Sequence, residues 1–217
     1  MTSLSTDNNE LTQLVELAAK GDDVAWQRLM DECRPRLRRM IALRLDHRLR
    51  GRIDPSDVIQ EACMDAARRL AEYAQNASMP FFLWLRYLCA QRLIDQHRRH
   101  LGTKVRDAAR ELALHHGAYP ETTTTDLAAH LLGRLTSPSQ AAIRVEQTIR
   151  LQEALCELDP IDREILALRH FEQLTNGEAA EVLGLDKSAT SKRYARALRR
   201  LKNVLLSMPG GREEHPS

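Results

Sequence analysis

The chain has 217 residues, with 32 lysines and arginines against 30 aspartates and glutamates, so its formal net charge is only +2. This near-balance excludes a polycationic coat that binds nucleic acid without selectivity, so any positive charge that serves binding is local. Aromatic residues make up 4% of the chain and charged residues 29%, and strand-like runs of Val, Ile and Thr are missing. Such a composition predicts an all-α protein of one large or two small domains.

The first hundred residues follow the periodicity of amphipathic helices. In chain order, the pattern predicts an irregular polar start (1–10), a helix (11–20), a helix that begins at Asp22 or Asp23, a basic helix (about 34–48), a helix (57–73) capped by Asp54 or Ser56, a polar loop (75–80) and a helix (81–100). We expect residues 11–100 to form one helical domain.

The periodicity weakens between residues 101 and 138, which we interpret as an interdomain linker. This stretch contains Pro120 and a run of threonines at 122–125. A weak region of such length favours two domains over one. The remaining predicted segments are short linker helices (105–116 and 126–134), a second helical domain (139–206) that opens with helices over 139–158 and 162–171, and a C-terminal tail (207–217).

Two capped helices separated by a glycine end the second domain. Thr175 and Glu178 form a capping-box pattern, which predicts a helix start. Gly184 suits the left-handed conformation that ends this helix, and Asp186 can cap the next one. Together with Ala180, a small residue where two helices can cross closely, this pattern predicts a helix-turn-helix.

The helix after this turn is strongly basic, with seven lysines and arginines and no acid between Lys187 and Lys202. Its apolar stripe is predicted at Tyr194, Leu198, Leu201 and Leu205. The basic residues left outside the stripe include Lys192, Arg193, Arg196, Arg199 and Arg200. A basic face is also typical of a solvated helix, but the caps and the absence of acids favour entry into the DNA major groove. Lys192 and Arg196, near the helix start, are predicted to read bases, and the later cations are predicted to contact phosphate.

The helix over 57–73 begins with a polar face. Asp57, Gln60 and Glu61 are three and four residues apart, so they share one side of the helix. Acids in a first turn are favoured by the helix dipole alone, and the same face also suits a basic partner helix. Spacing alone favours the interpretation that these acids interact only with the helix dipole.

Aromatic residues crowd the first turns of the helix over 81–100, directly after the polar loop. Trp84 and Tyr87 fit either the core or a stacking surface, because aromatic rings beside arginines are typical of single-stranded DNA binding. The residues assigned to the core are Phe81, Leu85 and Leu88.

The sequence predicts no catalysis, metal site or cofactor. No nucleophile–base pair or phosphate-binding loop is present, and no ligand spacing joins cysteines to histidines. Cys33, Cys63, Cys89 and Cys156 form no CxxC pair, which excludes a disulfide framework, and each is predicted to lie in the core. An N-terminus without an apolar signal region and the lack of a membrane-spanning segment predict a cytoplasmic protein without membrane contact.

Several short motifs occur in a fixed order along the chain. They are Leu14-Val-x-x-Ala18 with Gly21-Asp22 and Trp26, Asp57-Val-Ile-Gln-Glu61, Phe81-x-x-Trp84-Leu85, Ile94-Asp95-x-x-Arg98-Arg99, Leu158-x-x-x-Asp162-Arg163-Glu164, Ala180-Glu-Val-Leu-Gly184, and Ser188-Ala-Thr-Ser-Lys-Arg193 with Arg196. In this order and separation the motifs resemble a bacterial RNA polymerase sigma factor of the extracytoplasmic-function (ECF) type. Sigma region two corresponds to about 11–100 and region four to about 140–205.

The resemblance implies a sigma factor that binds core RNA polymerase and directs promoter recognition, DNA opening and transcription initiation. The residues implied to bind the polymerase are Asp57, Gln60 and Glu61. Those implied to contact the opened minus-ten element are Asn76, Trp84, Tyr87, Arg92, Asp95, Gln96 and Arg99. Those implied to contact the minus-thirty-five duplex are Lys187, Ser188, Thr190, Ser191, Lys192, Arg193 and Arg196. An anti-sigma protein or another regulator is a further implied partner.

The chain departs from the family pattern at Gln91, where many relatives have Asn, and at Thr190, where the helix-turn-helix usually buries Val. Its linker is also longer than in many relatives.

Two other functions fit the residues. A stand-alone helix-turn-helix transcriptional regulator would bind DNA without polymerase and would not use the polar face of the helix over 57–73. An adaptor that makes only protein contacts would not need the basic side chains of the last helix.

Overall fold

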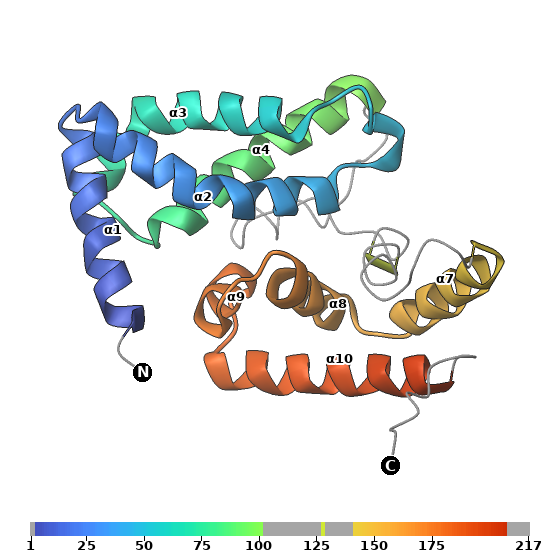
Figure 1. Ribbon diagram of the computed structural model, residues 1–217. Helices are drawn as coiled ribbons and strands as arrows, with labels where there is room; N and C mark the ends of the chain where they lie inside the picture. Colours follow the sequence, from blue (N-terminus) through green and yellow to red (C-terminus); the bar gives the residue numbers. More distant parts are fainter. Residues whose placement is uncertain (1–2, 102–126, 129–140, 208–217) are drawn as a thin grey trace, which may run out of the picture. The chain divides into compact units, whose positions relative to one another are not determined.

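The computed structural model describes residues 3–101, 127–128 and 141–207, and every regular element within these ranges is helical (Figure 1). The chain divides into two compact units, residues 1–120 and 121–217. These observations confirm the predicted all-α fold with two helical bodies. The division falls inside the stretch predicted as a linker, and the predicted domain boundaries at 100 and 139 stay predictions.

The first unit is built from α1 (Ser3–Ala19), α2 (Asp23–Arg44), α3 (Pro55–Gln75) and α4 (Phe81–Leu101). A short 3-10 turn, η1 (His47–Leu49), lies between α2 and α3. In Figure 1, α2, α3 and α4 lie alongside one another and α1 packs near the start of α2. Their facing sides bury apolar residues such as Leu29, Leu37 and Leu85 completely. This core fixes which sides of α3 and α4 face outward.

The first two helices differ most from the prediction. α1 begins at Ser3, within the segment predicted to be irregular. The two helices predicted on either side of residue 34 form the single helix α2, which passes through Pro35. A proline inside a helix removes one backbone hydrogen bond. The buried residues Cys33 and Leu37 nevertheless lie on one side of α2 across the proline, and this shared burial favours a continuous helix.

The second unit contains α7 (Ala141–Cys156), α8 (Pro160–Leu166), α9 (Asn176–Leu183) and α10 (Lys187–Ser207). α8 continues directly into a π-helical turn, η2 (Ala167–Phe171). α10 runs along α7, α8 and α9 (Figure 1). Arg163 ties the end of α7 to α8, because its Nη1 atom donates to the carbonyls of Leu155 and Leu158 at 3.2 and 2.8 Å.

The predicted caps of the helix-turn-helix are confirmed. The Glu178 N–H donates to the Thr175 hydroxyl at 3.2 Å, and the Thr175 N–H donates to the Glu178 carboxylate at 2.7 Å. Gly184 ends α9 with a φ of 62°, in the left-handed region. Asp186 accepts from the Ala189 N–H at 2.8 Å at the start of α10. These caps set where α10 begins, and therefore which of its side chains face outward.

The buried side of α10 differs from the predicted stripe. Leu201 is buried as expected, but Leu198 is exposed and Tyr194 is half-buried. Thr190 and Ala197 are fully buried instead. Thr190, Ala197 and Leu201 are seven and four residues apart, so they share one side of the helix. Small side chains at the first two positions allow α10 to approach its neighbours closely.

Some predicted features lie outside the described residues: the linker helix over 105–116, the tail beyond residue 207 and the side chain of Leu205. Within the predicted linker, the structure describes Leu127 and Ala128, which are helical and completely buried. This short piece therefore packs against other residues instead of serving only as a spacer.

The cysteines occupy different environments. Cys33 and Cys89 are buried as predicted, and burial raises the pKa of the Cys89 thiol, which favours its protonated form. Cys63 is half-buried. Cys156 is exposed, so its predicted place in the core is wrong, because α7 turns its neighbour Leu155 inward instead. Across the described ranges, no helix has the length and apolarity to cross a membrane, and no group of three or more His, Cys, Asp or Glu is arranged to hold a metal ion.

Candidate polymerase and nucleic-acid interfaces

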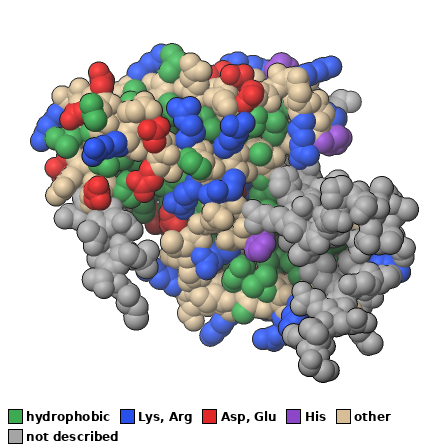
Figure 2. Space-filling view, viewed as in Figure 1, with side chains coloured by type: hydrophobic (Ala, Val, Ile, Leu, Met, Phe, Trp, Pro, Cys, Tyr) green, Lys and Arg blue, Asp and Glu red, His purple; other side chains and the backbone are tan. Residues whose placement is uncertain are grey.

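On the face drawn in Figure 2, the basic and acidic side chains of the described residues are interspersed with hydrophobic ones. This mixture agrees with the formal net charge of +2. Nucleic-acid binding by such a surface depends on a few placed side chains more than on a broad positive potential.

The polar side predicted at the start of α3 is present. Asp54 caps the helix, and its carboxylate accepts the N–H of Ser56 at 2.7 Å. Beyond the cap, Asp57 and Gln60 are exposed and Glu61 is half-buried. The apolar residues between them turn into the core, so these three form one outward surface, which we name the α3 polar face.

Met64 extends the α3 polar face by one turn. It is 53% exposed, and it lies seven residues after Asp57 on the same side of the helix. The sequence did not indicate this position, because an apolar residue in an amphipathic helix is normally assigned to the core. An exposed methionine is a common feature of surfaces that bind other proteins.

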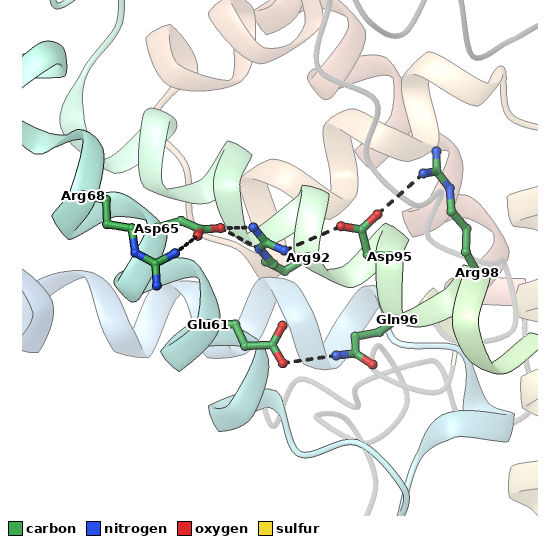
Figure 3. Close-up of polar contacts among 7 residues, drawn as sticks. All are labelled: Glu61, Asp65, Arg68, Arg92, Asp95, Gln96 and Arg98. Atoms are coloured by element: carbon green, nitrogen blue, oxygen red, sulfur yellow. Dashed lines mark hydrogen bonds and ion pairs between the residues drawn. The ribbon is translucent and has the colours of Figure 1, made fainter.

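Glu61 connects the α3 polar face to α4. The Gln96 Nε2 atom donates to the Glu61 carboxylate at 3.4 Å (Figure 3). The sequence assigned these residues to different partners, Glu61 to the polymerase and Gln96 to the promoter strand. Their contact joins the two predicted surfaces.

A series of ion pairs continues along the same two helices (Figure 3). Asp65 accepts from the Arg92 Nε atom at 2.7 Å and also from the Arg92 Nη2 atom. The other Asp65 oxygen faces Arg68 at 3.4 Å. On its far side, Arg92 is 3.8 Å from Asp95, which in turn lies 3.5 Å from Arg98. Arg92 is therefore held between two carboxylates.

The aromatic surface predicted on α4 is partly used by the fold itself. Trp84 stacks on Tyr73, with ring centroids 4.4 Å apart and ring planes at 17°. The Tyr73 hydroxyl donates to the Met79 carbonyl at 2.7 Å, which ties the polar loop to α3. Trp84 and Tyr87 are both half-buried, and the Tyr87 hydroxyl accepts from Gln91 at 2.6 Å. One face of the Trp84 ring is therefore covered by Tyr73.

The remaining predicted minus-ten residues lie toward opposite ends of α4. Asn76 is exposed at the C-cap of α3, in the loop that leads into α4, and Arg99 is exposed near the last turn of α4. From Phe81 to Arg99 a helix rises about 27 Å. The predicted residues thus follow the length of α4 and do not converge on one pocket.

His97 fixes the end of α4 to the corner after α2. The Asp46 N–H donates to the His97 Nε2 atom at 3.3 Å, and burial lowers the pKa of His97. Arg48, bonded to the Asp46 carboxylate, holds the pKa of Asp46 far below its usual range. The contact requires neutral His97, because a protonated imidazole has no acceptor nitrogen.

The predicted DNA-facing residues at the start of α10 are exposed: Lys187, Ser188, Ser191 and Lys192. Among the residues that the structure describes, neither lysine has an ion-pair partner. The Asn176 side-chain amide donates to the Lys187 carbonyl at 2.8 Å, which helps to fix the junction between α9 and α10.

Thr190 is not available for a base contact, so its predicted role at the minus-thirty-five duplex is wrong. Its side chain is completely buried, and its hydroxyl donates to the Asp186 carbonyl at 2.9 Å. The physical reason is its position on the buried side of α10 with Ala197. Its methyl group packs where the helix-turn-helix usually buries a valine.

A buried carboxylate from α8 holds the arginines in the middle of α10. The Asp162 Oδ1 atom accepts from the Arg193 Nη1 atom at 2.8 Å, and the Asp162 Oδ2 atom lies 3.3 Å from the Arg196 Nε atom. Farther along α10, Arg200 pairs with Glu157 at 2.6 Å in an exposed position. Among the described residues, the cations of α10 thus have no ion-pair partner at its start and are ion-paired in its middle.

Asp65 and Asp162 have no predicted site role, although each holds an arginine of a predicted DNA-facing helix. A local signal existed for Asp65, because it lies four residues after Glu61 on the same side of α3. Asp162 occurs in the motif Leu158-x-x-x-Asp162-Arg163-Glu164, but that motif does not indicate its partner Arg193, which is 31 residues away in the chain.

The sequence matches one protein family along almost the whole chain. The family model described as ECF sigma factor matches residues 8–205. This chain belongs to the ECF sigma factor family. The predicted function is thereby confirmed: this ECF sigma factor directs promoter-specific transcription initiation, and its partners are core RNA polymerase and promoter DNA. Family membership also decides against the stand-alone regulator and the adaptor.

This ECF sigma factor is similar to curated proteins from several bacteria. It is 28% identical to the ECF RNA polymerase sigma factor SigD of Mycobacterium tuberculosis over 205 residues, which are 94% of this chain and 88% of SigD. It is 30% identical to the probable RNA polymerase sigma factor RfaY of Xanthomonas campestris pv. campestris over 189 residues, 87% of this chain and 42% of RfaY. With the ECF RNA polymerase sigma factor BldN of Streptomyces coelicolor it shares 25% identity over 201 residues, 92% of this chain and 67% of BldN.

The fold of this ECF sigma factor is also found in a solved structure, that of CnrH in complex with the cytosolic domain of CnrY. The match has a TM-score of 0.51 and 22% sequence identity, and it covers 90% of this chain and 97% of the matched chain. This likeness supports the all-α fold.

Proposed function

We propose that the first unit of this ECF sigma factor binds core polymerase and the opened minus-ten element, and that the second unit reads the minus-thirty-five duplex. The observation that carries this division is that each unit turns polar residues of its helices outward. In the first unit these are the α3 polar face and α4, and in the second unit they are the start of α10.

The α3 polar face is the proposed polymerase contact. Asp57 and Glu61 supply negative charge, and Gln60 supplies donor and acceptor groups on the same side. Met64 adds exposed apolar area one turn farther on. An acidic surface with an apolar neighbour suits a basic partner helix, because charge complementarity steers association and apolar burial stabilises it.

The polar loop and α4 form the proposed surface for the opened minus-ten strand. Aromatic edges can stack on unpaired bases, and cations can contact the backbone. Capture of an extruded base offsets its unstacking cost of a few kcal/mol. The residues assigned to this surface are Asn76, Trp84, Tyr87, Arg92, Asp95, Gln96 and Arg99.

The start and middle of α10 form the proposed reader of the minus-thirty-five duplex. Serine hydroxyls and lysines near the helix start suit phosphate and base-edge contacts, and arginine suits guanine. Thr190 supports the helix from its buried side. The residues that keep a role in DNA contact are Lys187, Ser188, Ser191, Lys192, Arg193 and Arg196.

Binding to polymerase and DNA at the same time allows each contact to be weak by itself. Once one unit is attached, the effective concentration of the other unit at its own element rises. We further propose that the protein acts in the cytoplasm with the polymerase, that it has no enzymatic activity of its own, and that a protein regulator binds it. Support for a regulator comes from CnrH, which was solved in complex with the cytosolic domain of CnrY.

In vitro transcription tests the proposal. Purified core polymerase of the source bacterium is given DNA from upstream of the chain's own gene, with and without this protein. We expect transcripts from one defined start only when the protein is added. Arg196→Ala is expected to lower initiation while core binding stays normal, and Glu61→Lys is expected to lower core binding itself. Equal core affinity for the wild type and Glu61→Lys would contradict the assignment of the α3 polar face.

A further inference from the structure

Two arginines of α10 converge on a single buried carboxylate in α8. The Asp162 side chain is only 5% exposed, whereas the side chains of Arg193 and Arg196 are 30% and 61% exposed. Both carboxylate oxygens are occupied, one by each arginine. The carboxylate is therefore anchored inside the fold while the two guanidinium groups reach toward the surface.

The two arginines use different atoms for this contact. Arg193 bonds through its terminal Nη1 atom at 2.8 Å, and the same atom lies 3.9 Å from Asp159. Arg196 contacts Asp162 through its Nε atom at 3.3 Å, on the side of the guanidinium. Among the described residues, no hydrogen bond occupies the terminal nitrogens of Arg196, and a pair of arginine N–H groups can bond to O6 and N7 of guanine.

Such a contact lowers the conformational entropy that the side chain loses when DNA binds. An unrestrained arginine side chain samples many rotamers, and ordering it at an interface lowers affinity. Because Asp162 limits Arg196 before DNA arrives, less conformational freedom is lost in the complex. Arg193, bonded at its tip and half-buried, also connects α8 to α10.

We propose that Asp162 is a positioning residue that sets the direction of Arg196 and thereby determines base discrimination at the minus-thirty-five element. The inference rests on the proposed role of α10 as a duplex reader. Asp162 itself is buried and acts through Arg196. The Arg200–Glu157 pair offers a matched comparison on the same helix, because both of its side chains are exposed and surface pairs of this kind contribute little.

The test measures discrimination by the holoenzyme, formed from the full chain and core polymerase. The probes are a duplex selected by the wild-type holoenzyme from a randomised pool and the same duplex with each guanine pair replaced in turn. The ratio of the two affinities gives the discrimination at each pair. We expect Asp162→Asn to lower this ratio about tenfold at one guanine pair, the scale of one bidentate contact, and Glu157→Gln to leave every ratio within about twofold.

Two further variants separate positioning from simple support of the fold. Arg196→Lys removes the guanidinium fork and is expected to lower the ratio at the same guanine pair. Adding Asp162→Asn to Arg196→Lys is then expected to cost no further discrimination there, since both changes remove one interaction. Should Asp162→Asn fail to fold, Asp162→Glu keeps the charge but displaces it by one methylene, and the same loss at the same pair is expected.

The outcomes are distinguishable. If Arg196→Lys lowers the ratio but no Asp162 variant does, or if the Asp162 variants weaken binding to all duplexes equally, Asp162 only supports the fold and the inference is overturned. If Arg196→Lys changes no ratio, Arg196 does not read bases, and its proposed role fails together with the inference.

Discussion

Two places proposed to contact promoter DNA, the middle of α4 and the start of α10, hold their cations differently. In α4, Arg92 lies between Asp65 and Asp95, within hydrogen-bonding or ion-pair distance of both. At the start of α10, Lys187 and Lys192 have no ion-pair partner among the described residues. A paired cation must exchange partners before it reaches a phosphate, whereas an unpaired one does not. We therefore expect Lys187 and Lys192 to contact duplex DNA without breaking an ion pair, and Arg92 to exchange its ion pairs when a promoter strand arrives.

The difference fits the order of events during initiation. The minus-thirty-five element is double-stranded before and after polymerase binds, so its reader can be ready in advance. The minus-ten strand is exposed only when DNA opens. Ion pairs within the first unit keep Arg92 compensated until that moment, at the cost of breaking those pairs on binding.

The largest expected effect concerns the first unit alone. Glu61→Lys reverses a charge on the α3 polar face and removes the acceptor for Gln96. We expect the free energy of binding to core polymerase to become less favourable by about 2–5 kcal/mol, as for other disrupted interfacial charge pairs. Titration of labelled protein with core polymerase measures this, with Glu32→Lys, an exposed acid on α2, as the control. Equal losses for both variants would indicate a general charge effect instead of a specific interface.

A smaller effect separates the paired cation of α4 from a surface pair. Asp65→Asn removes the charged acceptor of the Arg92 Nε and Nη2 atoms and leaves half-buried Arg92 only Asp95 at 3.8 Å, so the free energy of unfolding should fall by about 1–3 kcal/mol. Arg68→Gln removes only the exposed partner of Asp65 and should cost about 0–1 kcal/mol. Urea unfolding followed by tryptophan fluorescence reports on the first unit, because Trp26 and Trp84 both lie there. Similar midpoints for the two variants would contradict the special role of the Asp65–Arg92 pair.

In the second unit, the turn between α9 and α10 helps to set where α10 begins. Gly184 has a φ of 62°, so Gly184→Ala should destabilise this unit by about 1–2 kcal/mol. Gln173 is a non-glycine residue with a φ of 59°, and Gln173→Gly should have the opposite sign, a gain of up to about 1 kcal/mol. Thermal unfolding followed by circular dichroism measures both. A destabilising Gln173→Gly would show that its side-chain contacts outweigh the backbone strain.

The smallest expected effect is a pH dependence confined to the first unit. Burial lowers the folded-state pKa of His97 below its ordinary value of about 6.5, so the folded state favours the neutral ring. The stability contributed by neutral His97 is present above about pH 6.5 and is lost as the pH falls toward the folded-state pKa. Between pH 7 and pH 5 we expect a loss of less than about 1 kcal/mol in urea unfolding, and a smaller loss in His97→Gln. An unchanged pH dependence in that variant would assign the effect to other groups.

Local features of the fold were predictable from the sequence, whereas contacts between distant residues were not. The capping box of α9 and its terminal glycine depend on residues three or four positions apart, which a single sequence displays. The Arg92–Asp65 and Arg193–Asp162 contacts join residues 27 and 31 positions apart. No local pattern specifies which acid meets which arginine across two helices.

The errors have the same origin. The side chain of Thr190 suits either the surface or the core. Only the packing of α10 against its neighbours places it in the core. The local sequence around Pro35 predicts a helix boundary, but the buried residues on either side of it keep α2 continuous. In both positions tertiary contacts override a weak local preference.

The division of DNA contacts between the two units is tested most directly by photo-crosslinking in the holoenzyme. A photoreactive amino acid is placed at Ser191 in α10 or at Asn76 before α4, both exposed positions, and the complex is irradiated on a promoter with a mapped start. We predict that Ser191 crosslinks to the minus-thirty-five duplex before and after opening, and that Asn76 crosslinks to one strand of the minus-ten element only after opening. Crosslinks from both positions to the same element, or none from Ser191 in a complex that initiates correctly, would contradict the assignment.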